Sequence, residues 1–312
     1  SKDLFLLPRE KRIELKKKEL DSLRPFSNLA LKRLKKRFDI LLSYNSNAIE
    51  GNTLNESETR LVIEEGMTIG GKSLKEHFEA KNHKKAIDFV ELIVDKKKKI
   101  NKEILCKLNE LILEGIMDEE IGIYRKRRVY VEGASFIPAK PDIIEKQMNQ
   151  FFKWLIDFNK NIIIKTAVAH EKFTLIHPFI DGNGRIARLL SNLILMKQGY
   201  PPIIILKTER KKYISTLDKA HNLNYKPFIN FIARCVERSF IMYLDVLKIP
   251  DPDEDYKKIS EIANSTKYSS EYISLLARKG RIGALKTRRN WLVSKKSLDD
   301  YIKTKRKYNK KV

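Results

Sequence analysis

The residues with the clearest chemical potential lie in one short stretch, which runs from His177 to Arg188 and reads HPFIDGNGRIAR. Pro178 disfavours helical geometry at the residue before it, so the preceding helix should end at His177. The imidazole then projects from a loop instead of lying on a packed helix face. The histidine is thereby presented from the loop, and its ring titrates near neutral pH.

The residues that follow this histidine suit a ligand that carries phosphate. Gly182 and Gly184 let backbone N–H groups approach a ligand closely, and the next helix adds unpaired N–H donors and the positive end of its dipole. Asp181 offers a hard carboxylate oxygen of the kind that Mg²⁺ prefers. Arg185 and Arg188 carry planar guanidinium groups that match phosphate oxygens. The stretch therefore predicts a presented histidine beside a phosphate site with a carboxylate of the kind that Mg²⁺ prefers.

Helices must position this loop, because most of the chain before residue 250 has helical periodicity. Helix starts are marked by Asn55 before Glu58 and by Ser73 before Glu76, both at capping-box spacing. One clear example of an apolar helix face is Ile144, Met148, Phe151, Phe152 and Leu155. The exception is residues 125–137, here called the flap, where β-branched and aromatic residues alternate around Glu132-Gly133 and predict a short β-hairpin. The expected fold class is mainly α.

The segment after a predicted long helix, 228–247, contains two prolines and four acidic residues and marks a domain boundary. We therefore expect N-terminal helices in 1–55, a catalytic domain in 56–248, a linker in 249–255 and a small domain in 256–312. The pattern of helix, turn, helix and strand pair in the last part predicts a winged helix-turn-helix domain.

Positive charge is concentrated in this small domain. Residues 256–312 hold 17 Lys and Arg against 4 Asp and Glu, a net +13 of the chain's +24. The distribution favours DNA as a partner, with 270–279 as the recognition helix and Lys286, Arg288 and Arg289 on the wing. A basic solvated surface and a protein-docking role for the same fold remain as alternatives.

Membrane insertion and secretion are not expected. No apolar run approaches the length that crosses a bilayer, and the N-terminal residues lack the apolar stretch and small-residue cleavage site of a secretory signal. We therefore expect a cytoplasmic protein without a membrane partner.

The stretch HPFIDGNGRIAR resembles the motif of the Fic family, HPFx[D/E]GNGRxxR, with every fixed position filled. The resemblance extends over roughly residues 25 to 245, which is the size of a domain. It implies a helical Fic-type domain with a flap, which transfers AMP from ATP to Ser, Thr or Tyr hydroxyls of a protein target or of itself.

The resemblance also implies a role for each motif residue. His177 would be the general base, and Asp181 would hold Mg²⁺ on the phosphates. Phe179 would point into the core and fix the loop. The anion hole and the sites for the outer phosphates would be formed by Gly182, Asn183, Gly184, Arg185 and Arg188.

A second motif lies far from the first in the sequence. Ser46-Asn-Ala-Ile-Glu50-Gly51 resembles the inhibitory signature [S/T]xxxE[G/N] of a Fic subclass. By that resemblance Glu50 forms a salt bridge with Arg188 in the place of the γ-phosphate. Both anions accept two parallel N–H bonds from one guanidinium, so the competition is physically reasonable. In some relatives the same glutamate is implicated in removal of AMP, and the sequence leaves that reverse reaction open.

Other features leave alternatives open. By resemblance, Val129 and Val131 in the flap would flank the acceptor, and adenine would bind near Tyr213, Ile214 and His221. Residues 66–73, GMTIGGKS, satisfy a P-loop pattern, but they follow a predicted helix where a P-loop needs a strand. An ATP-sensing transcription regulator, a Fic enzyme that transfers another phosphate-containing group, and a homodimer also remain open.

Overall fold

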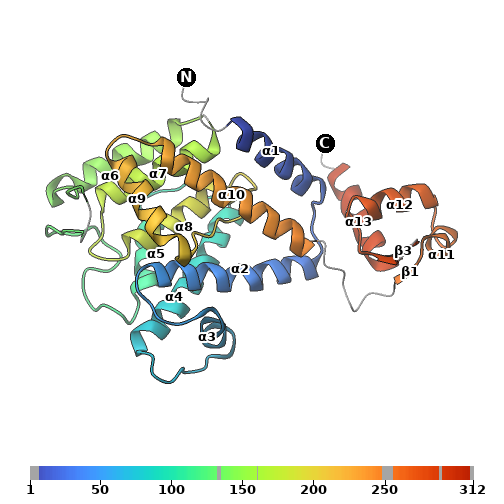
Figure 1. The fold of residues 1–312 in the computed structure, drawn as a ribbon, viewed down its shortest axis with the longest axis horizontal. Coiled ribbons are helices and arrows are strands. Elements are labelled where there is room, and N and C mark those ends of the chain that lie inside the picture. Colours follow the sequence, from blue (N-terminus) through green and yellow to red (C-terminus); the bar gives the residue numbers. More distant parts are fainter. Residues whose placement is uncertain (1–6, 132–134, 160, 248–255, 288–289, 310–312) are drawn as a thin grey trace. The chain divides into compact units, whose positions relative to one another are not determined.

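The computed structural model describes residues 7–131, 135–159, 161–247, 256–287 and 290–309, which form two compact units (Figure 1). The first unit comprises residues 1–11 and 37–239, and the second comprises residues 12–36 and 240–312. The predicted linker, 249–255, lies outside the described residues. The mainly helical fold class is confirmed.

The first unit is built from helices, and its longest described connection, between α5 and α6, contains the flap. The helix bounds up to residue 247 are α1 Leu7–Ser22, α2 Asn28–Ile49, α3 Glu56–Arg60, the π-helix η2 Leu61–Glu65, α4 Leu74–Asp95, α5 Lys102–Leu113, α6 Pro141–Asp157, α7 Ile162–Ile176, α8 Asn183–Met196, the 3₁₀ helix η3 Lys207–Glu209, α9 Arg210–His221 and α10 Lys226–Leu247.

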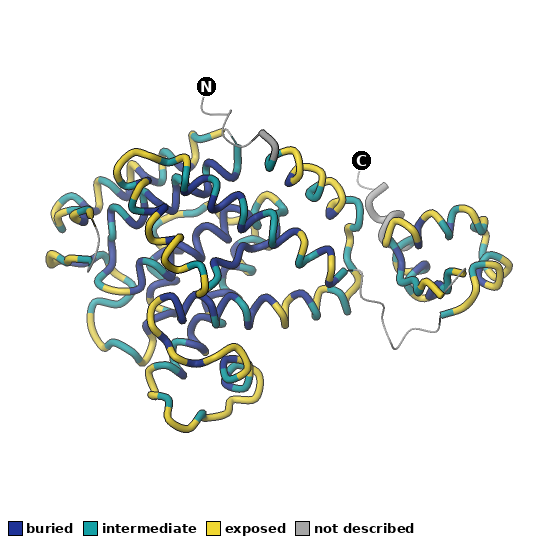
Figure 2. Tube along the Cα trace, in the orientation of Figure 1, coloured by how far each residue is buried: buried dark blue, intermediate teal, exposed yellow. Residues whose placement is uncertain are grey.

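Helix α8 lies at the centre of the first unit, in contact with α4, α5 and α7. Its residues 185–195 are all buried, as Figure 2 shows along this helix. The buried set includes the polar residues Arg185, Arg188, Ser191 and Asn192, so α8 is covered on its polar side as well as on its apolar side. The loop between α7 and α8 is thus held by the most buried pair of helices in the unit.

The flap is not a paired hairpin in the part of the chain that the structure describes. Residues 125–131 and 135–137 contain no strand, and the expected tip at residues 132–134 lies outside the described residues. The Arg125 guanidinium connects the two ends of the flap instead, because it donates to the Arg127 carbonyl at the start of the flap and to the Ala139 carbonyl shortly after its end. The alternation of β-branched and aromatic residues predicts a β-hairpin that the described flap residues do not form.

The C-terminal part of the second unit contains β1 Tyr256–Lys258, α11 Ile259–Asn264, α12 Ser270–Arg278, β2 Ala284–Thr287, β3 Asn290–Ser294 and α13 Lys295–Asn309. The strands form an antiparallel sheet in the order β1-β3-β2. Ile273, Leu276, Val293 and Leu298 bring α12, the sheet and α13 together in one apolar core. Helix, turn, helix and strand pair thus occur in the order that the sequence predicts.

No helix among the described residues is long and apolar enough to cross a bilayer.

Candidate active site

The loop that follows α7 begins at His177, as Pro178 predicts. His177 adopts the left-handed conformation, with φ 54° and ψ 59°, while its N–H still bonds the Phe173 carbonyl of the last helical turn. This conformation is uncommon for a residue with a side chain and is found where the surroundings enforce it. It turns the chain sharply, so the helix ends and the imidazole is carried on the loop.

The tautomer of His177 follows from the one hydrogen-bond contact that its ring makes in the described part of the chain. Nδ1 lies 3.2 Å from the Thr174 carbonyl oxygen, which can only accept, so Nδ1 carries the proton and Nε2 keeps its lone pair. Burial is the main cause that lowers the pKa of His177 to about 4. The imidazole is therefore neutral at physiological pH and has an unprotonated nitrogen available as a base.

Two residues hold the rest of the loop in one shape. Phe179 is fully buried, with its ring 5.5 Å from the Tyr124 ring and 6.3 Å from the Phe173 ring. The Asn183 side chain bonds the same residue twice, since its Oδ1 accepts from the Phe179 N–H and its Nδ2 donates to the Phe179 carbonyl. The Asn183 side-chain amide is thus buried in contacts that fix the loop and is not presented to a ligand.

The two glycines of the loop have no room for a side chain. Gly182 has φ 83°, and a Cβ there would lie 2.6 Å from Ile112 Cδ1. A Cβ on Gly184 would lie 2.5 Å from Glu50 Oε1. An anion therefore already rests against the bare backbone at the start of α8, where helix N–H groups and the dipole favour negative charge.

Arg185 is buried and is held by carboxylates on two sides. Its Nη2 lies 3.3 Å from Asp181 Oδ2 and its Nη1 lies 3.6 Å from Glu79 Oε1. Glu79 also accepts a hydrogen bond from Asn52, at 2.8 Å, so it connects Arg185 to the turn after Gly51. Arg185 Nε has no hydrogen-bond partner among the described residues.

Arg188 binds the predicted inhibitory motif directly. Its Nη2 donates to Glu50 Oε1 at 2.6 Å and to the Ser46 carbonyl at 3.0 Å, and its Nε donates to Ser46 Oγ at 2.9 Å. Burial opposes the charge on Arg188, but Glu50 and Tyr213 outweigh this effect, so its pKa lies above the usual value. The arginine is thus charged, buried and paired with Glu50.

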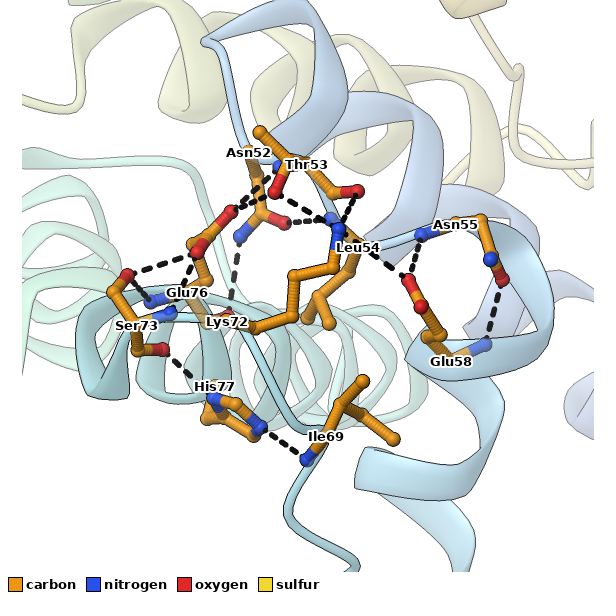
Figure 3. A network of polar contacts seen from close by, with 10 residues as sticks. All are labelled: Asn52, Thr53, Leu54, Asn55, Glu58, Ile69, Lys72, Ser73, Glu76 and His77. Carbon is orange, nitrogen blue, oxygen red and sulfur yellow. Dashed lines mark hydrogen bonds and ion pairs between the residues drawn. The ribbon is translucent and has the colours of Figure 1, made fainter.

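The turn after Glu50 is fixed by a hydrogen-bond network, drawn in Figure 3. Glu76 accepts from the backbone N–H and the hydroxyl of both Thr53 and Ser73. The bond from the Thr53 hydroxyl is the main cause that lowers the pKa of Glu76 to about 2. Lys72 donates to the carbonyl and hydroxyl of Thr53, so it closes the network from the other side.

The same network argues against the P-loop alternative. The chain before Gly66 is the π-helix η2, where a P-loop needs a strand. Lys72 is engaged by Thr53, and Ser73 caps α4. Residues 66–73 therefore form a structural connection.

Arg125 was missed by the sequence reasoning. Its side chain is buried and donates to three backbone carbonyls, one of which belongs to His177. No motif pointed to this residue, because its partners are backbone atoms.

The region expected to bind adenine is partly closed. Tyr213 is buried, with its hydroxyl 2.8 Å from His170 Nε2. The His221 ring lies against Phe136, with ring centroids 4.1 Å apart. Tyr213 thus belongs to the core behind Arg188, and a flap residue covers His221.

The structure brings together the motif residues 177–188 with Ser46, Glu50 and Gly51. The other predicted residues belong to the flap or to the second unit. Val129 and Val131 are half-buried in the flap. Lys286 is exposed on β2 in the second unit, and Arg288 and Arg289 lie outside the described residues.

These features define a helical domain that presents a histidine base beside a nest of backbone N–H groups. A family model described as "Fic/DOC family" matches residues 99–195. The chain is 38% identical over 237 residues to "Protein adenylyltransferase Fic" of Nematostella vectensis, which covers 75% of this chain and 55% of that protein. The chain spans about half the length of the curated relatives it matches.

Solved structures agree with this assignment. A Fic domain containing signaling protein from Bacteroides thetaiotaomicron superposes with a TM-score of 0.70 at 30% identity, over 75% of this chain and 96% of that one. Fic-1 from C. elegans, residues 134–508, gives a TM-score of 0.70 at 32% identity, over 78% and 74% of the two chains. The chain belongs to the Fic/DOC family.

Proposed function

We propose that the chain transfers AMP from ATP to hydroxyl groups of proteins, including its own. The observation that carries this proposal is the neutral His177, whose unprotonated Nε2 is carried on the loop that leads into the start of α8 and its two buried arginines, Arg185 and Arg188. The curated relatives are named protein adenylyltransferases, which supports the same chemistry.

In the proposed step, the acceptor oxygen attacks the α-phosphorus of ATP and its proton passes to Nε2 of His177. The bond from the α-phosphorus to the bridging oxygen breaks, and pyrophosphate leaves. The backbone N–H groups at the start of α8 stabilise the charge that develops on the phosphate oxygens, and Arg185 and Arg188 bind the outer phosphates.

Magnesium fits the donor set of this loop. The Asp181 side chain is half exposed beside the nest, and no cluster of three or more His, Cys, Asp or Glu that could hold a metal occurs among the described residues. A site with one protein carboxylate suits Mg²⁺, which takes its remaining ligands from phosphate oxygens and water. Asp181 would hold the ion, and the bound ion supplies positive charge to the phosphates.

We further propose that Glu50 inhibits the transfer. Its carboxylate lies on Arg188 and against Gly184, which is where a phosphate group would meet the same donors. An ATP molecule that binds with Glu50 in place loses one guanidinium, so its outer phosphates shift and the α-phosphorus is misaligned.

The test is incubation of the protein, and of Glu50→Gly, with Mg²⁺ and ATP labelled at either the α- or the γ-phosphorus. We expect label on protein from the α-position only, and mass spectrometry should find a Ser, Thr or Tyr that carries AMP. Label from the γ-position would show phosphoryl transfer, and ATP binding without any transfer would support an ATP-sensing regulator.

A second activity is proposed for the C-terminal domain, which would bind DNA. The observations that favour it are the helix-turn-helix order of α11 and α12, the β2-β3 strand pair with Lys286 exposed, and the net charge of residues 256–312. Deletion of residues 256–312 should abolish retention on DNA, and binding by the whole chain should weaken steeply with salt. Equal retention by the truncated protein would assign the charge to another role.

A further inference from the structure

Arg125 is the one fully buried arginine in the first unit's described residues that no carboxylate pairs, with 2% of its surface exposed. Its guanidinium donates from Nε to the His177 carbonyl at 2.8 Å, from Nη1 to the Arg127 carbonyl at 2.9 Å and from Nη2 to the Ala139 carbonyl at 2.6 Å. Its own backbone N–H bonds the Pro178 carbonyl at 2.9 Å. One side chain therefore joins the start of the flap, the residue just beyond its end, and the catalytic loop.

We propose that Arg125 is a positioning residue that fixes the flap at a set distance from His177, so that an acceptor hydroxyl held by the flap meets the base. This inference rests on the proposed transfer of AMP to proteins.

The geometry supports a positioning role because the side chain and the backbone N–H of Arg125 both tie the start of the flap to the catalytic loop. The described flap residues have no strand ladder, so their backbone groups need other partners. A planar guanidinium has donors in a fixed fork and holds three acceptors in one arrangement. Beyond the tip, Ser135 bonds Asp218 and Phe136 packs against His221, so the return side of the flap is also tied to α9.

The charge of Arg125 adds an independent readout. A buried cation without a carboxylate partner acts over a longer distance than an exposed one, because little water screens it. After burial and the opposing effect of the Thr174 hydrogen bond, Arg125 is a further cause that lowers the pKa of His177. Loss of this charge should therefore move the pKa of His177 upward, whereas loss of the flap contact alone should not.

The experiment uses the full chain with Glu50→Gly as the active parent. Arg125→Lys keeps the charge but cannot reach three carbonyls with one ammonium, and Arg125→Met removes both charge and bonds. Arg128→Met is the matched control, because Arg128 is an exposed flap arginine that makes none of these bonds. Each variant is given α-labelled ATP and Mg²⁺, and protein-bound label is compared with free AMP released by transfer to water.

Positioning through the flap predicts a specific change in this ratio. In Arg125→Lys and Arg125→Met, protein labelling should fall at least tenfold relative to free AMP while the KM for ATP changes less than about twofold, since water needs no flap. The acid limb of the pH profile should move to higher pH in Arg125→Met only. Arg128→Met should match the parent in all three measurements.

Two results separate this inference from the function on which it rests. If the parent yields neither labelled protein nor AMP, the proposed transfer fails. If the parent is active and both Arg125 variants keep its ratio of labelled protein to AMP, Arg125 has no positioning role. A thermal unfolding scan shows whether Arg125→Met is folded, and Arg125→Lys still decides the question if it is not.

Discussion

Replacement of Glu50 by glycine should release the buried arginine of the nucleotide site. Glu50 Oε1 lies 2.6 Å from Arg188 Nη2 and rests against Gly184. In Glu50→Gly, the γ-phosphate of ATP no longer competes with a tethered carboxylate for this guanidinium. We expect tighter ATP binding and faster self-labelling.

The size of the effect follows from the exposure of the pair. The Arg188 side chain is 7% exposed and that of Glu50 is 40% exposed, so the contact is partly open to water. A charge-assisted hydrogen bond of this kind is worth about 1–2 kcal/mol, less than the roughly 3–5 kcal/mol lost when a fully buried pair is broken. Because about 1.4 kcal/mol is a factor of ten, ATP affinity should rise about 5- to 30-fold.

The assay combines calorimetric titration of ATP with self-labelling at a fixed, low ATP concentration. Glu65→Gly is the matched control, since Glu65 is also an exposed glutamate directly before a glycine at a helix end. Arg188→Ala should stay poorly active, and the double variant should equal Arg188→Ala because both changes act on one contact. Additive effects in the double variant, or unchanged affinity and labelling in Glu50→Gly, would refute the reasoning.

Three further predictions concern the base, the network and the loop. His177→Ala should abolish AMP transfer and keep ATP binding within about twofold. In the active variant Glu50→Gly, the rate of transfer should be level from about pH 6 to 8. It should fall as the pH approaches about 4, where the imidazole of His177 takes up a proton. The pKa of Glu76 is about 2 in the folded protein and 4.5 for a free glutamate, so Glu76 stabilises the fold above pH 4.5 and loses this effect toward pH 2. Thermal unfolding of Glu76→Gln should therefore lack that part of the acid dependence. Gly182→Ala should lower the free energy of unfolding by about 1–3 kcal/mol in urea, because φ is positive and Ile112 blocks the new methyl group, whereas Gly70→Ala, in open space, should not.

The sequence predicts best those features whose partners are close along the chain. The capping boxes at Asn55 and Ser73 are both present with both of their hydrogen bonds. The end of a helix at His177 follows from the proline beside it. These features depend on backbone geometry over three or four residues, which the residue types fix directly.

Contacts between distant backbone atoms could not be predicted. Arg125 meets carbonyls that are 14 and 52 residues away, and any residue type supplies a carbonyl. The loss of the predicted hairpin has the same origin, since residues that alternate like a strand form one only when a partner strand aligns with them. The link from Asn52 through Glu79 to Arg185 likewise appears only when α4 and α8 are packed together.

The position of Gly184 limits where activating mutations can arise. The carboxylate of Glu50 and a phosphate group would use the same bare backbone and the same arginine, so a change in residues 182–188 that expels one also excludes the other. Residues 46–51 are free of this constraint, because they contain the inhibitory Glu50 and do not form the phosphate-binding nest. In a library of random single substitutions selected for high labelling, gain-of-function variants should therefore collect at residues 46–51, at the end of α2 and in the turn after it, and be missing from residues 182–188.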